Sequence, residues 1–192
     1  MHRLSTSFVL AYHGCREAVG EKLLAGAAFQ PSENTYDWLG PGVYFWESNP
    51  RRGIDFMREK AQRAGLPSSD LFVVGAVVEL GACLDFTTSG SMALLKAAYR
   101  SFAHTMAAIG VPLPVNSRNA MRRDLDCAVI RQLHSTFDIA GVAPVQSVKG
   151  VFTEGGPIYP GSAIPSKTHI QIAVRDPACI KGVFRVPRLS LN

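Results

Sequence analysis

The chain has 192 residues, of which 47% are hydrophobic and 18% are charged, and it carries a net charge of +5 at pH 7. This length and composition are typical of one globular domain with a sizeable core, and we predict a single domain over residues 1–192. The longest apolar stretch, residues 71–78, is far too short to cross a bilayer, which argues against a membrane-spanning protein and against a membrane partner.

The positions of the basic residues and of the cysteines argue against further kinds of function. Basic residues are scattered, and their short clusters, Arg51–Arg52 and residues 118–123, form no polybasic tail. The four cysteines are far apart and contain no CxxC motif, so we expect no metal site and no redox motif. The apolar run at the N-terminus is too short for a signal peptide, and we therefore expect a reduced, cytoplasmic protein.

Apolar periodicity and turn residues predict the elements in chain order. The first half has a strand, a helix, a long loop, a short β-type run and a second helix, over residues 7–13, 15–25, 27–41, 42–47 and 50–64. The second half has two strands, two amphipathic helices and three further strands, over residues 71–80, 82–86, 91–109, 120–137, 145–153, 169–175 and 181–186. Strands at both ends with helices between them indicate an α+β fold, and we expect the terminal strands to pair with each other.

A Gly/Pro-rich segment, EGGPIYPGSAIPSK (154–167), separates the strands predicted over 145–153 and 169–175. Long ordered loops without secondary structure of their own are often functional. We therefore count this loop among the candidate functional segments.

Three short segments carry the candidate chemistry. His13–Gly14 ends the first predicted strand, Gly42–Phe45 (GVYF) follows a Gly-rich turn, and THIQIAVRDP (168–177) forms a late strand. In order and spacing they resemble the ADP-ribosyltransferases of the poly(ADP-ribose) polymerase and diphtheria-toxin branch, whose signature His, Tyr and Glu lie on three separate strands. Gln171 stands where that family has its glutamate, counted five residues before Asp176.

The resemblance implies the fold of that family, an α+β split antiparallel β-sandwich with flanking helices. It also implies an enzyme that takes NAD as co-substrate, uses no metal and releases nicotinamide through a transition state that resembles an oxocarbenium ion. Such an enzyme must hold the dinucleotide bent, bury the nicotinamide and stabilise the positive ribose.

The first two segments would form the NAD pocket. By the resemblance, His13 bonds a ribose hydroxyl, the backbone of Gly14 meets the carboxamide, and Tyr44 packs on the nicotinamide. Close backbone approach favours glycine, and ring stacking favours an aromatic residue. The alternatives are a strand-end histidine capped by a backbone group and one more core aromatic residue.

Two residues are candidates for the second wall of this pocket. The family's second stacking tyrosine falls on Asp55 here, so Phe56 or Trp46 would serve instead. Period-two alternation places Tyr44 and Trp46 on one face of their strand, and we assign Phe45, on the other face, to the core.

Gln171 is the departure from the family that matters most. Alternation turns His169, Gln171 and Arg175 to one face of the last motif strand, which is either a cleft or the solvated face of an edge strand. Glutamine keeps the hydrogen bond of the family's acid and loses its charge, a difference of about 1–1.5 kcal/mol, or about tenfold in rate. Family members without the glutamate generally add a single ADP-ribose, so the resemblance implies mono-ADP-ribosylation.

Four further residues have candidate roles. Glu154, in the loop before the third motif strand, is placed as general base on the acceptor, with Tyr159 to position that acceptor. Arg52, with Arg51, opens the second helix, where phosphate binding is favoured, so it is placed at the pyrophosphate of NAD. The alternatives are a solvated loop with an exposed acid and two surface arginines.

These observations favour an NAD-dependent mono-ADP-ribosyltransferase acting on a protein or nucleic-acid acceptor. By analogy with small bacterial enzymes of this kind, it resembles toxins and phage-defence effectors, which implies an antitoxin or inhibitor protein as a further partner. The alternatives are an NAD glycohydrolase and a catalytically inactive NAD or ADP-ribose reader, which Gln171 favours. A nucleic-acid-binding domain is disfavoured because no basic stripe with interleaved aromatic residues is present.

Overall fold

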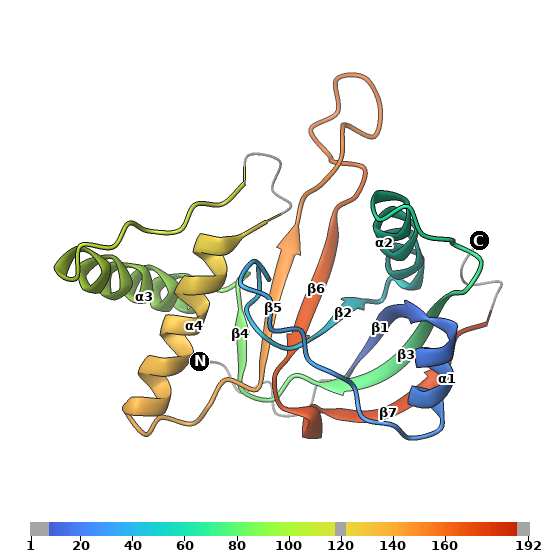
Figure 1. Cartoon of the computed structure of the whole chain (residues 1–192), viewed down its shortest axis with the longest axis horizontal. Helices are drawn as coiled ribbons and strands as arrows, with labels where there is room; N and C mark the ends of the chain where they lie inside the picture. The colour runs from blue at the N-terminus through green and yellow to red at the C-terminus, as the bar shows by residue number, and fades with distance from the viewer. Residues whose placement is uncertain (1–7, 118–121, 188–192) are drawn as a thin grey trace.

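The computed structural model describes residues 8–117 and 122–187 (Figure 1). The strands are β1 (Phe8–Arg16), β2 (Val43–Glu47), β3 (Leu71–Glu79), β4 (Cys83–Asp85), β5 (Ser147–Phe152), β6 (His169–Val174) and β7 (Ile180–Arg185). The helices are α1 (Glu17–Leu24), α2 (Pro50–Arg63), α3 (Ser89–Ala108) and α4 (Asp124–Ile139), with a short 3₁₀ turn over Pro177–Cys179. Each predicted helix and strand is present, with bounds shifted by a few residues. Residue 7 of the first predicted strand and residues 120–121 of the helix predicted over 120–137 lie outside the described residues.

The strands form one mixed sheet in the order β4-β5-β6-β2-β1-β3-β7. Neighbouring strands are antiparallel except β4 and β5, which are parallel, so the expectation of a fully antiparallel arrangement is wrong at that edge. The terminal strands do not pair with each other, because β3 lies between β1 and β7. The α+β class is confirmed.

The sheet changes direction near its middle. In Figure 1, β4, β5 and β6 run upright, whereas β1, β3 and β7 run across the molecule. The two groups are joined through β2, whose ladder with β1 has only two residue pairs, Ala11 with Glu47 and Tyr12 with Trp46. The sheet is therefore continuous, and its narrowest link lies between β1 and β2.

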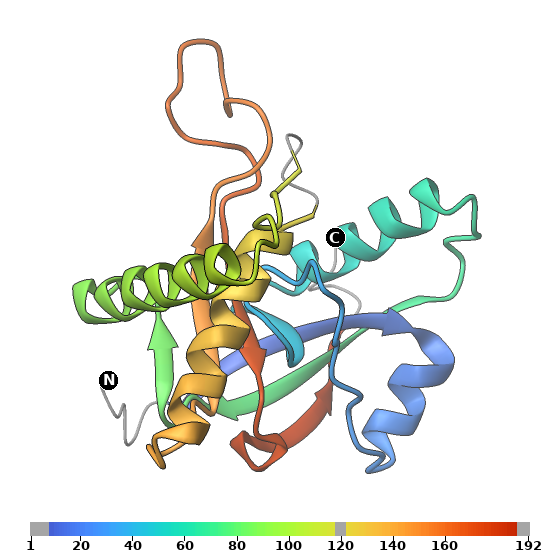
Figure 2. The same cartoon turned by 60° about the vertical axis from the view of Figure 1, so that its left-hand side comes forward.

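Helices cover the two halves separately (Figure 2). α3 and α4 pack on the β4–β5–β6 half, where Val129 and Leu133 of α4 meet Val148 and Ala173 of the sheet. α2 packs on β1 and β3, with Ile54 against Val73. The narrow link between β1 and β2 thus lies between two helical covers.

Two local features of the sequence position the site residues. Pro50 opens α2, and the Asn49 side chain caps it by accepting a hydrogen bond of 2.9 Å from the Arg52 N–H, which fixes Arg52 in the first turn. β1 continues to Arg16, so His13–Gly14 lies inside the strand, and its expected place at the strand end is wrong. Phe45 is fully buried, which confirms its assignment to the core.

His134 of α4 is a buried histidine without a hydrogen-bond partner on either ring nitrogen within the described residues. Burial, together with the nearby charges of Arg175 and Arg131, lowers the pKa of His134 to about 3. The ring is therefore neutral in the folded protein at neutral pH.

We expect this histidine to make the fold acid-sensitive. The unfolded chain binds a proton at His134 near pH 6.5 and the folded chain only near pH 3, so the free energy of unfolding falls as the pH drops through this window. Each pH unit corresponds to about 1.4 kcal/mol. His134→Leu removes the titrating group and is expected to flatten this slope, which urea unfolding at pH 7, 6, 5 and 4 measures. An unchanged slope in the variant would contradict the assignment.

Candidate functional site

The three motif segments lie on three adjacent strands, β1, β2 and β6, at the centre of the sheet. Trp46 of β2 is paired with Tyr12 of β1 on one side and with Gln171 of β6 on the other. Directly paired residues share a face, so these side chains form one row on the sheet. Tyr44 lies on the same face, opposite Ala173.

His13 faces the other side of the sheet. Its ring packs edge-on to Phe29, with centroids 5.4 Å apart, and lies 5.7 Å from the ring of Phe45. The Nδ1 atom lies 2.8 Å from the carbonyl oxygen of Tyr44, just past the last ladder pair of β1 and β2. The side chain of His13 thus extends the narrow link between the two strands.

The bond to the carbonyl fixes the tautomer of His13. A carbonyl oxygen only accepts, so Nδ1 carries the hydrogen and Nε2 presents a lone pair. Burial lowers the pKa of His13, although the Tyr44 carbonyl opposes this shift. His13 is therefore a neutral, half-buried ring whose Nε2 makes no hydrogen bond within the part of the chain that the structure describes.

Gly14 is packed against the start of α2. A Cβ atom at Gly14 would lie 2.6 Å from the carbonyl oxygen of Gly53 and 2.8 Å from Cγ of Met57. Close approach of a helix backbone therefore accounts for glycine at this position without a ligand.

Tyr44 is tied into the loop that precedes its strand. Its hydroxyl donates to the Gly40 carbonyl at 2.8 Å and accepts from the Leu39 N–H at 3.0 Å. Burial raises the pKa of Tyr44 well above its usual value, so the hydroxyl stays protonated. The ring packs with the core between the sheet and α4, as the alternative of a core aromatic predicts.

Gln171 is 5% exposed and lies on a central strand, so the alternative of a solvated edge strand is wrong. Its Oε1 accepts a 2.7 Å hydrogen bond from Nε1 of Trp38. Trp38 in turn stacks on Phe152, with ring centroids 3.2 Å apart. Within the described chain the Gln171 amide nitrogen makes no hydrogen bond, so it is a donor without a partner.

Arg52 is 8% exposed, whereas Arg51 lies at the surface and faces Asp55. The Nη2 atom of Arg52 lies 3.2 Å from Glu154 and 3.5 Å from Glu59. Its Nε and Nη1 atoms are buried without a partner among the described residues. The alternative of two surface arginines therefore holds for Arg51 and is wrong for Arg52.

Trp46 and Phe56 pack on each other, with ring centroids 5.0 Å apart. Trp46 is buried, and its Nε1 is another donor without a partner in the described chain. Phe56 is half-buried, and the Arg52 guanidinium lies 6.0 Å from its ring centroid. These two rings and Arg52 form one cluster beside Gln171.

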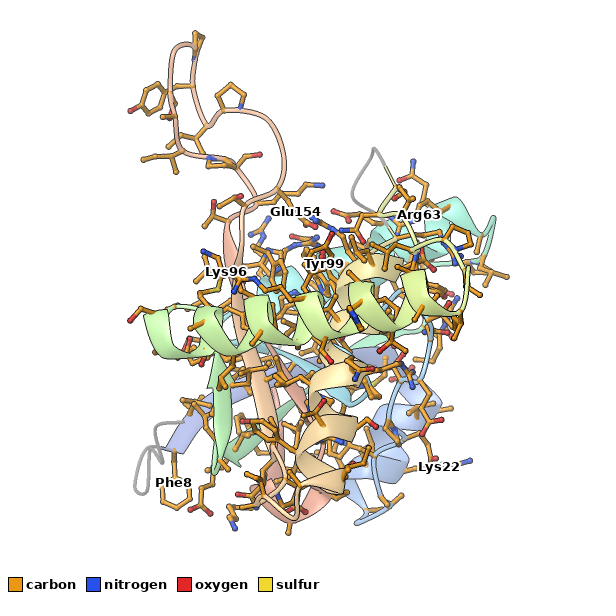
Figure 3. All side chains as sticks on the ribbon, turned by 90° about the vertical axis from the view of Figure 1, so that its left-hand side faces the viewer. Phe8, Lys22, Arg63, Lys96, Tyr99 and Glu154 are labelled. Atoms are coloured by element: carbon orange, nitrogen blue, oxygen red, sulfur yellow. The ribbon has the colours of Figure 1, made fainter. Side chains whose placement is uncertain are left out.

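The loop over residues 153–168 projects from the ends of β5 and β6 as a hairpin-like finger (Figure 2). Backbone hydrogen bonds hold its two arms together, including 2.9 Å from Lys167 N to Glu154 O and 2.8 Å from Ser166 N to Gly156 O. Glu154 lies at the base of the finger (Figure 3). Tyr159 is 59% exposed, and its carbonyl accepts a hydrogen bond of 3.0 Å from Ser162 N within the finger. The finger is anchored to α2 by Arg52–Glu154 and by a 2.7 Å ion pair from Lys167 to Glu59.

A separate groove of about 320 Å³ lies between α3 and α4. Its lining is mainly apolar and includes none of the predicted site residues: Met92, Leu95, Lys96, Tyr99, Arg100, Leu125, Asp126 and Val129. The four cysteines are buried and free, and burial raises the pKa of Cys15 and Cys83 to about 11. Within residues 8–117 and 122–187 there is no cluster of His, Cys, Asp or Glu that fits a metal ion, and no helix long and apolar enough to span a membrane.

Searches of protein-family models, curated proteins and solved structures found no match to this chain. The candidate site is therefore defined by geometry alone. It comprises Trp46 and Gln171 on the sheet, Arg52 and Phe56 on α2, and Glu154 at the base of the finger, which we call the Arg52 cluster.

Sequence reasoning missed two residues beside this cluster. Trp38 lies in a loop and has no periodic pattern that would place it over Gln171. His169 shares a face with Gln171 by simple alternation, but only the structure shows that its ring is buried.

Substituting Gly14 tests whether helix packing accounts for this glycine. Gly14→Ala forces the added Cβ into the backbone of Gly53, and we expect it to destabilise the fold by about 1–3 kcal/mol. Gly90→Ala in α3 meets open space and is the matched control, with an expected change within about 1 kcal/mol. Thermal unfolding of both variants measures the difference, and equal stability would contradict the packing account.

Proposed function

We propose that this protein is an NAD-dependent mono-ADP-ribosyltransferase with the fold of that family. The observation that carries the proposal is the adjacency of β6, β2 and β1, which places HIQ, GVYF and HG side by side where the sheet is narrowest. Segments about 30 to more than 100 residues apart in sequence thus lie on adjacent strands, with Tyr44 and Gln171 on one face of the sheet and His13 on the other.

The NAD site is centred on the Arg52 cluster. The Gln171 amide nitrogen is a donor without a partner within the described chain, suited to a ribose hydroxyl. The Nε and Nη1 atoms of Arg52 are two more such donors, near the start of α2, and suit a pyrophosphate oxygen. The Nε and Nη1 atoms of Arg52 are buried, and buried donors without partners cost free energy, which a bound dinucleotide would recover.

The roles of the first two motif segments change under this proposal. His13 turns away from Gln171, so we assign it to positioning: it holds the Tyr44 carbonyl where β1 and β2 separate. Gly14 allows α2 to approach, and α2 carries Arg52. Trp46 and Phe56 supply the aromatic surface for nicotinamide in place of a second tyrosine.

The finger over residues 153–168 suits contact with a large acceptor. Ile158, Tyr159 and Ile164 are exposed along it, and exposed apolar side chains favour a macromolecular contact. The net charge of +5 mildly favours an anionic acceptor such as a nucleic acid. A toxin-like role with an inhibitor protein, in the cytoplasm, belongs to the same proposal.

An NAD or ADP-ribose reader is the second candidate, and one observation favours it. The two carboxylates nearest the site, Glu154 and Glu59, are both paired with cations, and the position of the family's acid is occupied by an amide. Binding without cleavage needs only the donors of Gln171 and Arg52.

Nicotinamide release from NAD by the purified chain separates these candidates. A transferase releases nicotinamide when cell lysate supplies acceptors and labels a macromolecule with ADP-ribose. A glycohydrolase releases it in buffer alone. NAD binding without release would support the reader, and the absence of binding would refute all three.

Substitutions at Gln171 test the site. Gln171→Ala removes the ribose contact and is expected to lower the rate of nicotinamide release at least tenfold, whereas Gln171→Glu restores the charge and is expected to raise it about tenfold. Gln62→Ala, at an exposed glutamine of α2, is the matched control. Equal rates for all four proteins would remove Gln171 from the site.

A further inference from the structure

His169 is a buried imidazole with one nitrogen anchored and the other without a partner. It is the first residue of β6, it shares a face with Gln171, and it is 5% exposed. Its Nδ1 lies 2.7 Å from the carbonyl oxygen of Lys167, so Nδ1 carries the hydrogen. Nε2 then presents a lone pair, and this buried atom has no hydrogen-bond partner in the part of the chain that the structure describes.

The surroundings of His169 keep it neutral. Burial lowers its pKa, and the positive charge of Arg52 lowers it further, while the Lys167 carbonyl and the Glu154 and Glu59 charges oppose the shift. These charged groups come from α2 and from the finger, the two elements that meet beside the histidine.

Aromatic rings complete the enclosure on the sheet side. The ring of Phe152 lies 5.9 Å from His169, and the ring of Trp38 lies 6.3 Å away. Neither ring offers a donor to Nε2, because the one N–H of Trp38 is given to Gln171. An oriented lone pair on a buried atom, with no donor from the described protein, calls for a donor from a ligand.

We propose that His169 is the general base of the proposed transfer and that the acceptor is a neutral hydroxyl group, an inference that rests on the proposed function. The acceptor oxygen forms a bond to C1′ of the nicotinamide ribose as the C1′–N bond breaks. Nicotinamide leaves as a neutral molecule, and the acceptor proton passes to Nε2 of His169 and then to solvent.

The geometry favours His169 over Glu154 for this role. The Glu154 carboxylate is held by Nη2 of Arg52 at 3.2 Å, whereas Nε2 of His169 has no competing partner among the described residues. Glu154 instead supplies negative charge close to the imidazolium that forms. A carboxylate acceptor would need no base, so this arrangement points to an acceptor that must lose a proton, and we take the hydroxyl group as that acceptor.

His169→Asn tests the assignment. Asparagine retains a donor near the position of Nδ1 for the Lys167 carbonyl and removes the basic Nε2, which favours retention of the fold. The same substitution at the exposed His104 of α3 is the matched control. Because the acceptor is unidentified, the probes are water and dilute methanol, with nicotinamide and methyl ADP-ribose as the measured products.

We expect His169→Asn to lower kcat about 100-fold with the KM for NAD little changed, a loss typical for removal of a general base. Because burial lowers the pKa of His169, the rate of the wild-type protein should fall only at a pH below the usual histidine range, where His169 becomes protonated, and this acidic limb should vanish in the variant. Methyl ADP-ribose should form in the wild-type protein and the His104→Asn control.

Two results would overturn the inference, and they differ in what else they refute. An active wild-type protein with an unchanged kcat and pH profile in His169→Asn would refute the base alone and leave the transferase standing. No release of nicotinamide by the wild-type protein in water, methanol or lysate would refute the proposed function and the base together.

Discussion

The narrow link between β1 and β2 is the constraint on which the rest of the structure depends. Two ladder pairs join the halves of the sheet, and the imidazole of His13 adds a bond to the Tyr44 carbonyl where the ladder stops. Because the strands separate there, Gly14 is free to receive the backbone of α2 at close range. That contact places α2 against β1, and the first turn of α2 carries Arg52. His13 and Gly14 thus help to position the Arg52 cluster, although neither residue is part of it.

The Arg52 cluster shows how burial changes the interactions that a charged side chain requires. An exposed arginine has little effect on stability, but a buried guanidinium must be paired and hydrogen-bonded. Arg52 has Glu154 and Glu59 on one nitrogen and nothing from the described protein on the other two. The ion pair between Arg52 and Glu154 also holds the finger against α2. An anion that binds Arg52 therefore interacts with the same charged groups that hold the finger in place.

The order of elements could be predicted from the sequence because it depends on local patterns. Pro50 and the apolar spacing that follows it predict α2, and alternation in HIQIAV predicts the faces of β6. The partners of the strands depend on long-range pairing, which no local pattern encodes, and so the insertion of β3 between β1 and β7 was not predictable. The face of the sheet on which His13 lies could not be predicted either. It depends on how β1 is placed in the sheet, which the residues of β1 alone do not determine.

The site residues also divide into those that local patterns predict and those that depend on long-range contacts. The sequence identified Gln171, Arg52, Trp46 and Glu154 as candidates, and the structure places them near one another, although their roles remain proposals. Trp38 and His169 were not predicted because their importance depends on their surroundings. The indole N–H of Trp38 is directed at Gln171, and one imidazole nitrogen of His169 has no donor from the described chain.

In the free protein, an amide at position 171 is easier to accommodate than a carboxylate, whose counter-charge would come only from the positive ribose of the transition state. A buried charge there would need a cation, and Arg52, the buried arginine of the cluster, is already shared between two glutamates. An amide needs only one donor for its oxygen, and Trp38 supplies it, which leaves the nitrogen to a ligand. Proton removal then falls to a group that is neutral before the reaction, and His169 meets that condition at the same face of β6.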